Sequence, residues 1–393
     1  MPASSFVSQR LAPFGTTIFT EMTRLATEHG AVNLAQGFPD FDGPELAKEA
    51  AIAAIRAGRN QYARMLGDPA LNQAIAARWQ RTTGQVIDPD SQVTVTSGCT
   101  EAIPAAMLGL INPGERVVLF EPYYDSYRAC VSLAGAVPVF VTLRPRGDGS
   151  GFEFDPDELR RVMQTRPRAI VVNTPHNPTG KVYSREELSL IASLCIEHGV
   201  LAITDEVYSE LVYEPDQPHI SLATLPGMAE RTITLNSLGK SFSLTGWKIG
   251  WAIASAELTR GVRAAHQFLT FATCTPMQLG AAAILTEGDG YVRSLVADYR
   301  RRRDFLSAAL SGLGMRVYPP AGSYFIMADH SALGFADDVA FCRQLTEQIK
   351  VAAIPPSVFY DNPDHGRRFA RFAFCKKDQT LEEAVRRLGA LRR

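Results

Sequence analysis

A chain of 393 residues, of which 46% are hydrophobic and 21% are charged, has an ordinary globular composition and is long enough for two packed cores. The formal net charge of -1 gives no electrostatic reason to expect nucleic acid or an acidic membrane surface as a partner. No apolar stretch approaches the roughly 20 residues that cross a bilayer, and Met1–Phe6 lacks the basic and apolar segments of a secretory signal.

The six cysteines are scattered along the chain and include no Cys-x-x-Cys pair. This spacing is typical of reduced thiols, most of them small core residues, and it gives no indication of a metal site. Together with the missing secretory signal, it predicts a cytoplasmic protein. The only dense basic run, Arg300–Arg303, is expected to be solvated because helical spacing spreads four arginines around a helix.

Between about residue 45 and about residue 290, short apolar runs alternate with helical patterns. The runs expected to form strands are Val93–Thr96, Arg116–Phe120, Val137–Val141, Ala169–Val172, Leu201–Thr204, Thr232–Leu235 and Lys248–Ala254. The amphipathic segments expected to form helices between them include Thr100–Leu110, Arg185–Glu197 and Ala256–Phe268. Apolar strands separated by helices indicate an α/β fold with a mainly parallel sheet covered on both faces.

Beyond about residue 295 the pattern changes to a smaller α+β unit. A long basic helix is expected at Val292–Leu310 and a last helix at Leu381–Leu391. The short strands expected between these helices lie near Arg316–Tyr318, Tyr324–Met327, Val351–Ala352 and Phe369–Phe374. The first 44 residues are expected to pack with this unit. The pattern therefore predicts a large domain of residues 45–290 and a small domain of residues 1–44 and 291–393.

Polar residues follow three of the predicted strands, and ligands of open parallel sheets bind outside these carboxyl ends. The first segment, Val95–Glu101, contains Gly98 at a helix start whose free amides suit a phosphate, although the same pattern is typical of an ordinary tight turn. The second segment is Asn173–Gly180, in which two prolines and a glycine hold Asn177 in a rigid turn. Its side chain either donates to a ligand oxygen or bonds only within the turn. His176 has no metal-ligand partner at a useful spacing and is interpreted as a loop histidine.

The third segment places Asp205 at the end of an apolar strand, with Tyr208 close enough to share a pocket. A buried acid is costly unless a cation or a donor pairs with it, and the alternative is that Asp205 caps a helical turn. Further along, Lys240 and Lys248 lie in a region with few charges. Desolvation lowers the pKa of a lysine and frees its amine for carbonyl chemistry. Spacing alone does not distinguish these two lysines.

Four motifs follow one another in order. They are Asn177-Pro178-x-Gly180, Asp205-Glu206-Val207-Tyr208, Ser237-x-x-Lys240 and Gly246-Trp247-Lys248-x-Gly250-Trp251. In order and interval the chain resembles class I aminotransferases of fold type I, from Asn33–Pro39 through Arg371–Phe372. The branch that it resembles contains kynurenine aminotransferase I, also called glutamine transaminase K, and bacterial methionine and N-succinyldiaminopimelate aminotransferases.

The resemblance implies a pyridoxal 5'-phosphate (PLP) enzyme of the α/β class with the fold type I architecture. Lys240 would then form the internal aldimine and afterwards move the proton between the substrate Cα and the cofactor. Asp205 would keep the pyridine nitrogen protonated, which tunes the ring as an electron sink. Asn177 and Tyr208 would bond to the ring hydroxyl oxygen.

The remaining cofactor contacts are also implied by the resemblance. Gly98, Cys99, Ser237 and Lys248 would surround the phosphate, and Tyr124 would stack on the ring. A surface position is the alternative for Tyr124.

The same resemblance identifies residues that bind the substrate. Arg371 would grip the α-carboxylate, which suits a bidentate guanidinium better than an ammonium, although by pattern alone it could pair with a structural acid. Gly37, Phe19, Asn177 and Phe271 are the other expected substrate contacts. Tyr62 corresponds to a residue that reaches the phosphate of the neighbouring subunit, and Phe271 also matches a residue of the partner chain, so a homodimer is implied.

The substrate pocket departs from the kynurenine branch at three positions. Phe19 replaces its tryptophan, Cys99 its tyrosine and Ala272 its histidine. With aromatic residues and no identifiable second arginine, the pocket favours a neutral or aromatic amino donor, such as glutamine, methionine, phenylalanine or kynurenine, and a 2-oxo acid acceptor in a ping-pong mechanism. The alternatives are N-succinyldiaminopimelate as the donor, or a β-lyase acting on cysteine conjugates. An effector-sensing domain of a transcription regulator is disfavoured because no DNA-binding segment or basic patch accompanies it.

Overall fold

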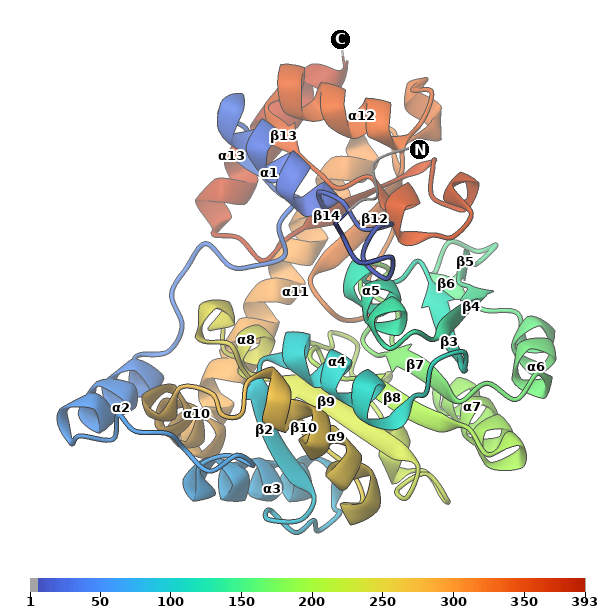
Figure 1. The fold of residues 1–393 in the computed structure, drawn as a ribbon. Helices are drawn as coiled ribbons and strands as arrows, with labels where there is room; N and C mark the ends of the chain where they lie inside the picture. The colour runs from blue at the N-terminus through green and yellow to red at the C-terminus, as the bar shows by residue number, and fades with distance from the viewer. Residues whose placement is uncertain (1–5, 393) are drawn as a thin grey trace.

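The computed structural model describes residues 6–392, which fold into two lobes, one above the other in Figure 1. The lower lobe contains a seven-stranded sheet, and the upper lobe combines a helix near the amino terminus with the carboxyl-terminal part of the chain. Residues 1–5, on which the argument against a secretory signal depends, lie outside the described residues. Within the described part, no helix is long and apolar enough to span a membrane.

The strand order in the large sheet is β2-β10-β9-β8-β7-β3-β4. These strands are β2 (Val93–Ser97), β3 (Arg116–Glu121), β4 (Val137–Thr142), β7 (Ala169–Asn173), β8 (Leu201–Asp205), β9 (Thr232–Ser237) and β10 (Ile249–Ile253). Only β10 runs antiparallel to its neighbours. The α/β prediction with a mainly parallel sheet is confirmed, and each predicted strand is present within two residues of its expected ends.

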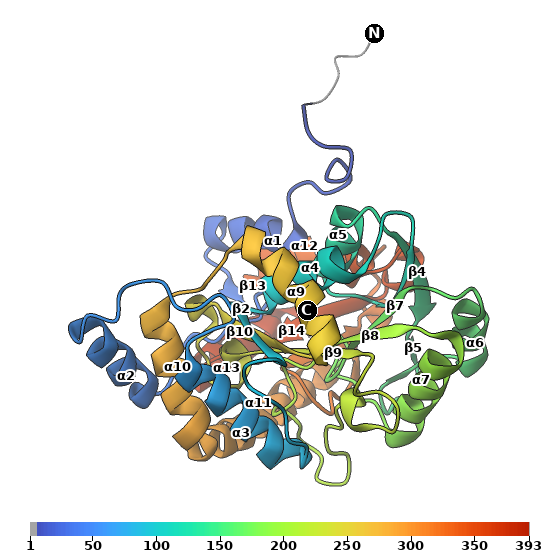
Figure 2. The same cartoon turned by 60° about the horizontal axis from the view of Figure 1, so that its bottom comes forward.

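Apolar residues fill both faces of this sheet because the side chains of a strand alternate between them. Along β3, Val117 and Leu119 pack into one core, whereas Val118 and Phe120 pack into another. The helices of the lower lobe are α2 (Glu45–Arg56), α3 (Pro69–Thr83), α4 (Cys99–Leu110), α5 (Asp125–Leu133), α6 (Pro156–Gln164), α7 (Arg185–His198), α8 (Leu238–Ser241), α9 (Ala256–Leu269) and α10 (Thr275–Glu287). Figure 2 shows these helices around the sheet. A small hairpin of β5 (Arg144–Pro145) and β6 (Phe152–Glu153) lies beside β4.

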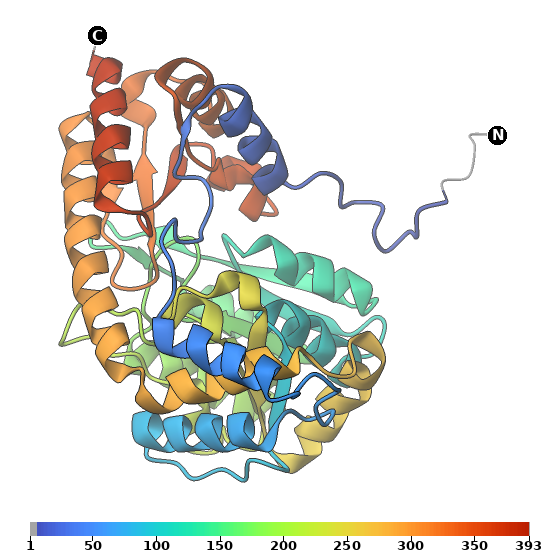
Figure 3. The same cartoon turned by 90° about the vertical axis from the view of Figure 1, so that its left-hand side faces the viewer.

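The upper lobe is built on an antiparallel sheet with the order β11-β12-β14. Its elements are α1 (Ile18–Glu28), β1 (Val32–Asn33), β11 (Arg316–Tyr318), β12 (Phe325–Asp329), α12 (Asp338–Gln344), β13 (Val351–Ala352), β14 (Phe369–Ala373) and α13 (Asp378–Leu388). The amino-terminal segment joins this lobe through parallel pairing of β1 with β13. Figure 3 shows α11 (Asp289–Gly312) running along both lobes. We retain the division into residues 45–290 and residues 1–44 with 291–393 as a proposal.

One sequence-based expectation about the surface is wrong. Arg303 is buried on α11, where its guanidinium pairs with Glu214 and Asp304, whereas Arg300 and Arg301 are exposed. Arg303 is covered because this face of α11 packs against the segment that contains Glu214.

Candidate active site

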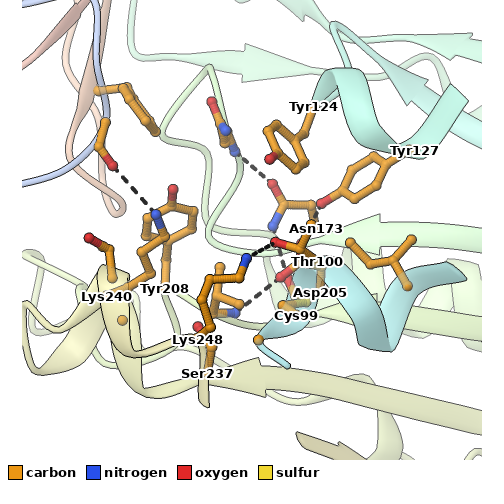
Figure 4. A pocket seen from close by; sticks show the side chains of 18 of the residues that line it. Cys99, Thr100, Tyr124, Tyr127, Asn173, Asp205, Tyr208, Ser237, Lys240 and Lys248 are labelled. Carbon is orange, nitrogen blue, oxygen red and sulfur yellow. Dashed lines mark hydrogen bonds between the residues drawn. The ribbon is translucent and has the colours of Figure 1, made fainter. Parts of the chain in front are cut away.

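A cavity of about 400 Å³ lies between the two lobes at the carboxyl ends of the parallel strands. Asn173, Asp205 and Ser237 end β7, β8 and β9, and all three line this cavity. In Figure 4 their side chains gather around one space, beside Tyr127 of α5 and Tyr124, which immediately precedes α5. The three strand ends therefore meet as the sheet topology predicts.

One end of the cavity is suited to an anion. Gly98 precedes α4, and no side chain caps the first amides of this helix. The Lys248 ammonium donates to the Thr100 hydroxyl at 2.9 Å (Figure 4), and Ser237 lines the same cavity. Free amides at a helix start, together with an ammonium and a hydroxyl, form the kind of site that binds phosphate.

The middle of the cavity holds one buried carboxylate. Asp205 accepts a hydrogen bond from the Tyr127 hydroxyl at 2.7 Å and another from the Val207 amide at 3.3 Å. Burial raises the pKa of Asp205 above its ordinary value, and the Tyr127 hydrogen bond opposes this increase. The bond to Val207 matches the alternative that Asp205 caps a turn. That bond, however, leaves the buried charge without a cationic partner at hydrogen-bond distance among residues 6–392.

Lys240 lies on α8 beside this carboxylate. Its ammonium nitrogen is 2.7 Å from the Tyr324 hydroxyl and lies over the Tyr208 ring, 5.7 Å from the centroid. Burial lowers the pKa of Lys240, and the nearby acidic groups Cys375 and Asp205 oppose this. A partly buried amine with a lowered pKa suits attack on a carbonyl. Lys248, by contrast, is engaged with Thr100 at the phosphate-like end, so the geometry favours Lys240 as the nucleophile.

Arg371 also lines the cavity, away from the contact between Lys248 and Thr100. It is 1% exposed, and its guanidinium donates to the Asn177 side-chain oxygen at 3.0 Å and to the Ala35 carbonyl at 2.8 Å. Burial lowers the pKa of Arg371 to about 10. Among the described residues it forms no ion pair, and its Nε has no hydrogen-bond partner. The structure therefore gives no support, among the described residues, to the alternative of a structural acid as its partner. A buried cation of this kind is suited to an anionic ligand.

The contacts of Asn177 bear on whether its side chain faces a ligand or bonds only within its own turn. Its side-chain oxygen accepts from Arg371, while its backbone amide donates to the Asn173 side chain. The side chain therefore points into the cavity instead of bonding only within its own turn. His176, next to it, is buried, and its ring contacts the Thr179 hydroxyl at 2.9 Å.

Most of the other expected contact residues also line the cavity. The set consists of Phe19, Gly37, Gly98, Cys99, Tyr124, Tyr208, Ser237 and Lys248. The Phe19 ring lies beside the Arg371 guanidinium, and the Cys99 thiol is buried next to Asp205, which raises its pKa together with burial itself. Tyr124 meets Tyr127 edge to face.

Tyr62 and Phe271 do not join this cavity. Their rings contact each other at 5.5 Å, and the two side chains are 85% and 37% exposed. The structure therefore brings these two residues together on the surface and apart from the others. Their expected role in a partner's site stays a prediction.

Sequence reasoning missed several residues of the site. Tyr127 bonds to Asp205, Tyr324 bonds to Lys240, and Phe325 lies 4.1 Å below the Arg371 guanidinium. Asn173, at the end of β7, also lines the cavity. The position of Tyr127 one helical turn after Tyr124 could have indicated it, but Tyr324 lies 84 residues from Lys240 and carries no local signal.

Comparisons with known proteins agree with this arrangement. Residues 29–388 match the family model described as aminotransferase class I and II. The chain is 48% identical to a Mycobacterium tuberculosis protein named probable N-succinyldiaminopimelate aminotransferase DapC, over 97% of this chain and 98% of the relative. It is 39% identical to the methionine aminotransferase of Escherichia coli, over 97% of each chain.

Solved structures give the same result. The structure of N-succinyldiaminopimelate aminotransferase from Mycobacterium tuberculosis matches with a TM-score of 0.95 and 49% identity, over 98% of this chain and all of that one. Thermus thermophilus aspartate aminotransferase with maleate matches with a TM-score of 0.90 and 32% identity, over 98% of this chain and all of that one. The chain belongs to the class I and II aminotransferases and has the fold type I architecture of these PLP-dependent enzymes.

Proposed function

We propose that this aminotransferase holds PLP on Lys240 and transfers the amino group of a neutral or aromatic L-amino acid to a 2-oxo acid by a ping-pong mechanism. The observation that carries the proposal is the order of charges along one cavity. A phosphate-like site at Lys248 is followed by the buried Asp205 and the partly buried Lys240, and then by Arg371, which has no ion-pair partner among the described residues. This order of groups is the one expected for a PLP–amino acid pair, with a phosphate at one end and an α-carboxylate at the other.

The cofactor, when bound, supplies a carbonyl that amines attack and a ring that accepts electrons. Lys248, Ser237 and the start of α4 would hold its phosphate. Asp205 would hold a proton on the ring nitrogen, because a buried carboxylate is stabilised by a cationic neighbour. Lys240 would attack through its neutral amine and then carry the proton to and from the substrate Cα.

Arg371 would orient the amino acid. Its planar guanidinium presents two parallel donors to the α-carboxylate, and Asn177 and the Ala35 carbonyl fix the guanidinium in place. The neighbouring walls are aromatic, with Phe19 beside the guanidinium and Phe325 below it. These contacts would exclude water from the carboxylate and leave the side chain of the donor against apolar surface.

The preference for a neutral side chain follows from the charges that line the cavity. Its basic residues are Lys240, Lys248 and Arg371, and each already has a role. A side-chain carboxylate would then be buried without a cation, which costs several kcal/mol, on the order of 3. Glutamine, methionine, phenylalanine and kynurenine meet this requirement.

N-succinyldiaminopimelate is the second candidate donor. It is supported by the 48% identity to a relative that bears this activity in its name, and by the small Cys99 at the cavity wall. A third outcome, β-elimination from cysteine conjugates, would use the same Lys240 amine.

A panel of donors tests the proposal. The purified protein with PLP would be assayed with glutamine, methionine, phenylalanine, kynurenine, aspartate and N-succinyldiaminopimelate, each with 2-oxoglutarate or pyruvate. A neutral donor is expected to give the highest kcat/KM. Aspartate ahead by more than about tenfold, or roughly 1.4 kcal/mol, would contradict the neutral pocket, whereas N-succinyldiaminopimelate ahead would favour the second candidate. Pyruvate and ammonia from a cysteine conjugate, without amino transfer, would indicate the lyase.

We also propose that the working unit is a homodimer. Tyr62 and Phe271 form an exposed aromatic pair, and Phe268 and Leu269 beside them are 89% and 44% exposed. Apolar side chains that gather at one exposed place are typical of an interface.

The cytoplasmic location predicted from the sequence stays a prediction.

A further inference from the structure

Tyr324 connects the two lobes at the Lys240 amine. It lies next to the first residue of β12 in the upper lobe, is 0% exposed, and contacts Lys240 of the lower lobe at 2.7 Å. Its hydroxyl also bonds to the Gly37 carbonyl. The Lys240 nitrogen is 3.4 Å from the same carbonyl, so the tyrosine hydroxyl is its shorter contact.

The direction of these hydrogen bonds is fixed by their partners. The Gly37 carbonyl can only accept, and the Tyr324 hydroxyl is closer to it than the Lys240 amine is, so the single hydrogen of the hydroxyl points to Gly37. The hydroxyl oxygen therefore accepts a hydrogen from the Lys240 amine. A neutral amine bound in this way acts only as a hydrogen-bond donor to Tyr324 and Gly37 and keeps its lone pair free, which is the state that a base requires.

Close packing holds the hydroxyl in this orientation. The Tyr324 ring meets Tyr208 at 5.1 Å and Phe325 at 4.8 Å, both edge to face. Gly37 passes so close that a Cβ there would come within 2.5 Å of the Phe325 ring and 3.2 Å of the Tyr324 ring. The carbonyl that orients the hydroxyl thus has little room to move.

We propose that Tyr324 is a positioning residue for amino transfer. After the substrate has displaced Lys240 from the cofactor, Tyr324 holds the Lys240 amine so that the lone pair of the amine is directed away from the tyrosine. This inference rests on the proposed function. Lys240 would then take the proton from the substrate Cα, so that the C–H bond breaks, an N–H bond forms, and the electron pair stays with the substrate. Without Tyr324, the flexible lysine side chain would sample several orientations before each transfer.

The test compares Tyr324→Phe with Tyr299→Phe. Tyr299 is a matched control because it is 0% exposed, its ring lies 6.1 Å from Tyr324, and its hydroxyl has no hydrogen-bond partner among the described residues. The first measurement is the pH dependence of the rate at which cofactor-free protein captures PLP covalently. Loss of the acceptor disfavours the ammonium form, so Tyr324→Phe is expected to lower the midpoint by about one pH unit. Tyr299→Phe should leave it unchanged.

The second measurement uses a donor deuterated at Cα. In Tyr324→Phe, kcat should fall about tenfold or more with an increased isotope effect, while KM changes less than threefold because Arg371 is untouched. Equal behaviour of the two variants in both measurements would overturn the proposal. If Tyr324→Phe fails to fold, 3-fluorotyrosine at position 324 should shift the midpoint in the same direction by a smaller amount, and no shift would overturn it. Wild-type protein that captures no PLP would contradict the proposed function instead.

Discussion

Burial changes the ionisation of Asp205, Lys240 and Arg371 at the site, and the direction of the pKa shift depends on the charge of the group. For Asp205 it raises the pKa, whereas for Lys240 it lowers the pKa, so both residues are shifted toward their neutral forms. For Arg371 it lowers the pKa to about 10, which leaves the guanidinium charged at neutral pH. A ligand that brings a ring nitrogen to Asp205 and a carboxylate to Arg371 would compensate both buried charges.

His176 carries a pH-dependent prediction outside the chemistry. Burial lowers its pKa to about 3 in the folded chain, against an ordinary value of 6.5. Between these values the unfolded chain binds a proton that the folded chain does not. Stability is therefore lost as the pH falls from 6.5 toward 3. From pH 7 to pH 5 this loss should be about 2 kcal/mol for the one residue.

Urea unfolding at pH 7 and pH 5 measures this effect. His176→Asn, which keeps a polar partner for Thr179, is expected to lose about 2 kcal/mol less than the wild type over this interval. The difference between the two proteins removes the contribution of other titrating groups. An equal loss in both would show that His176 is not held neutral.

Some of these residues could be predicted from the sequence and others could not. Asp205 and Asn177 come after apolar strand residues. A polar side chain at such a position is expected at the carboxyl edge of the sheet, because the interior of the sheet is apolar. Tyr324 gives no such signal, because its partner Lys240 is brought to it by the packing of the two lobes. The burial of His176 is also a tertiary effect, since its local sequence describes only a turn.

At the scale of elements, the phosphate-like end depends on the contact between β10 and β2. Gly250 pairs with Thr96 across these antiparallel strands. A Cβ at Gly250 would lie 2.5 Å from the Gly98 carbonyl carbon and 2.7 Å from the Cys99 amide nitrogen. Both atoms are backbone, so the turn before α4 would have to move.

We therefore expect Gly250→Ala to weaken PLP binding by tenfold or more, because the amides that hold the phosphate would be displaced. Gly246→Ala is the control, since nothing lies within 4 Å of the Cβ that it would add. Titration of each cofactor-free protein with PLP, followed by absorbance, gives the two affinities. Similar affinities for both variants would show that the turn tolerates the displacement.

The strands were predictable because their apolar runs are short and bounded by polar turns. The predicted start of the last strand of the sheet at Lys248 is one residue early, since this residue has a positive φ of 55° and the strand begins at Ile249. The expectation that Arg303 is exposed to solvent is wrong because of tertiary packing. Helical spacing does not show which other segment of the chain covers a face of the helix. The antiparallel direction of β10 likewise follows from chain topology and has no local signature.

At the scale of the whole molecule, the proposed dimer predicts complementation between two inactive variants. Tyr62→Ala removes the residue expected to reach the partner's phosphate site, and Lys240→Ala removes the anchor. In a mixed dimer one site would contain both native residues. Random reassociation should therefore restore up to about a quarter of the wild-type activity.

Each variant mixed with itself is the control, and subunit exchange would be shown separately with a labelled chain. No recovery despite demonstrated exchange would place Tyr62 in the site of its own subunit. The expected role of Tyr62 in a partner's site does not follow from the folded chain alone, because Tyr62 and Phe271 lie on the surface and away from the cavity.

The central claim is that Lys240 carries the cofactor. Borohydride reduction of the PLP-treated protein, followed by digestion and mass spectrometry of the peptides, tests it most directly. We predict one modified lysine per chain, Lys240, because its amine is partly buried with a lowered pKa, whereas the Lys248 amine bonds to Thr100. Modification of Lys248 in place of Lys240, or no modified lysine at all, would contradict the account.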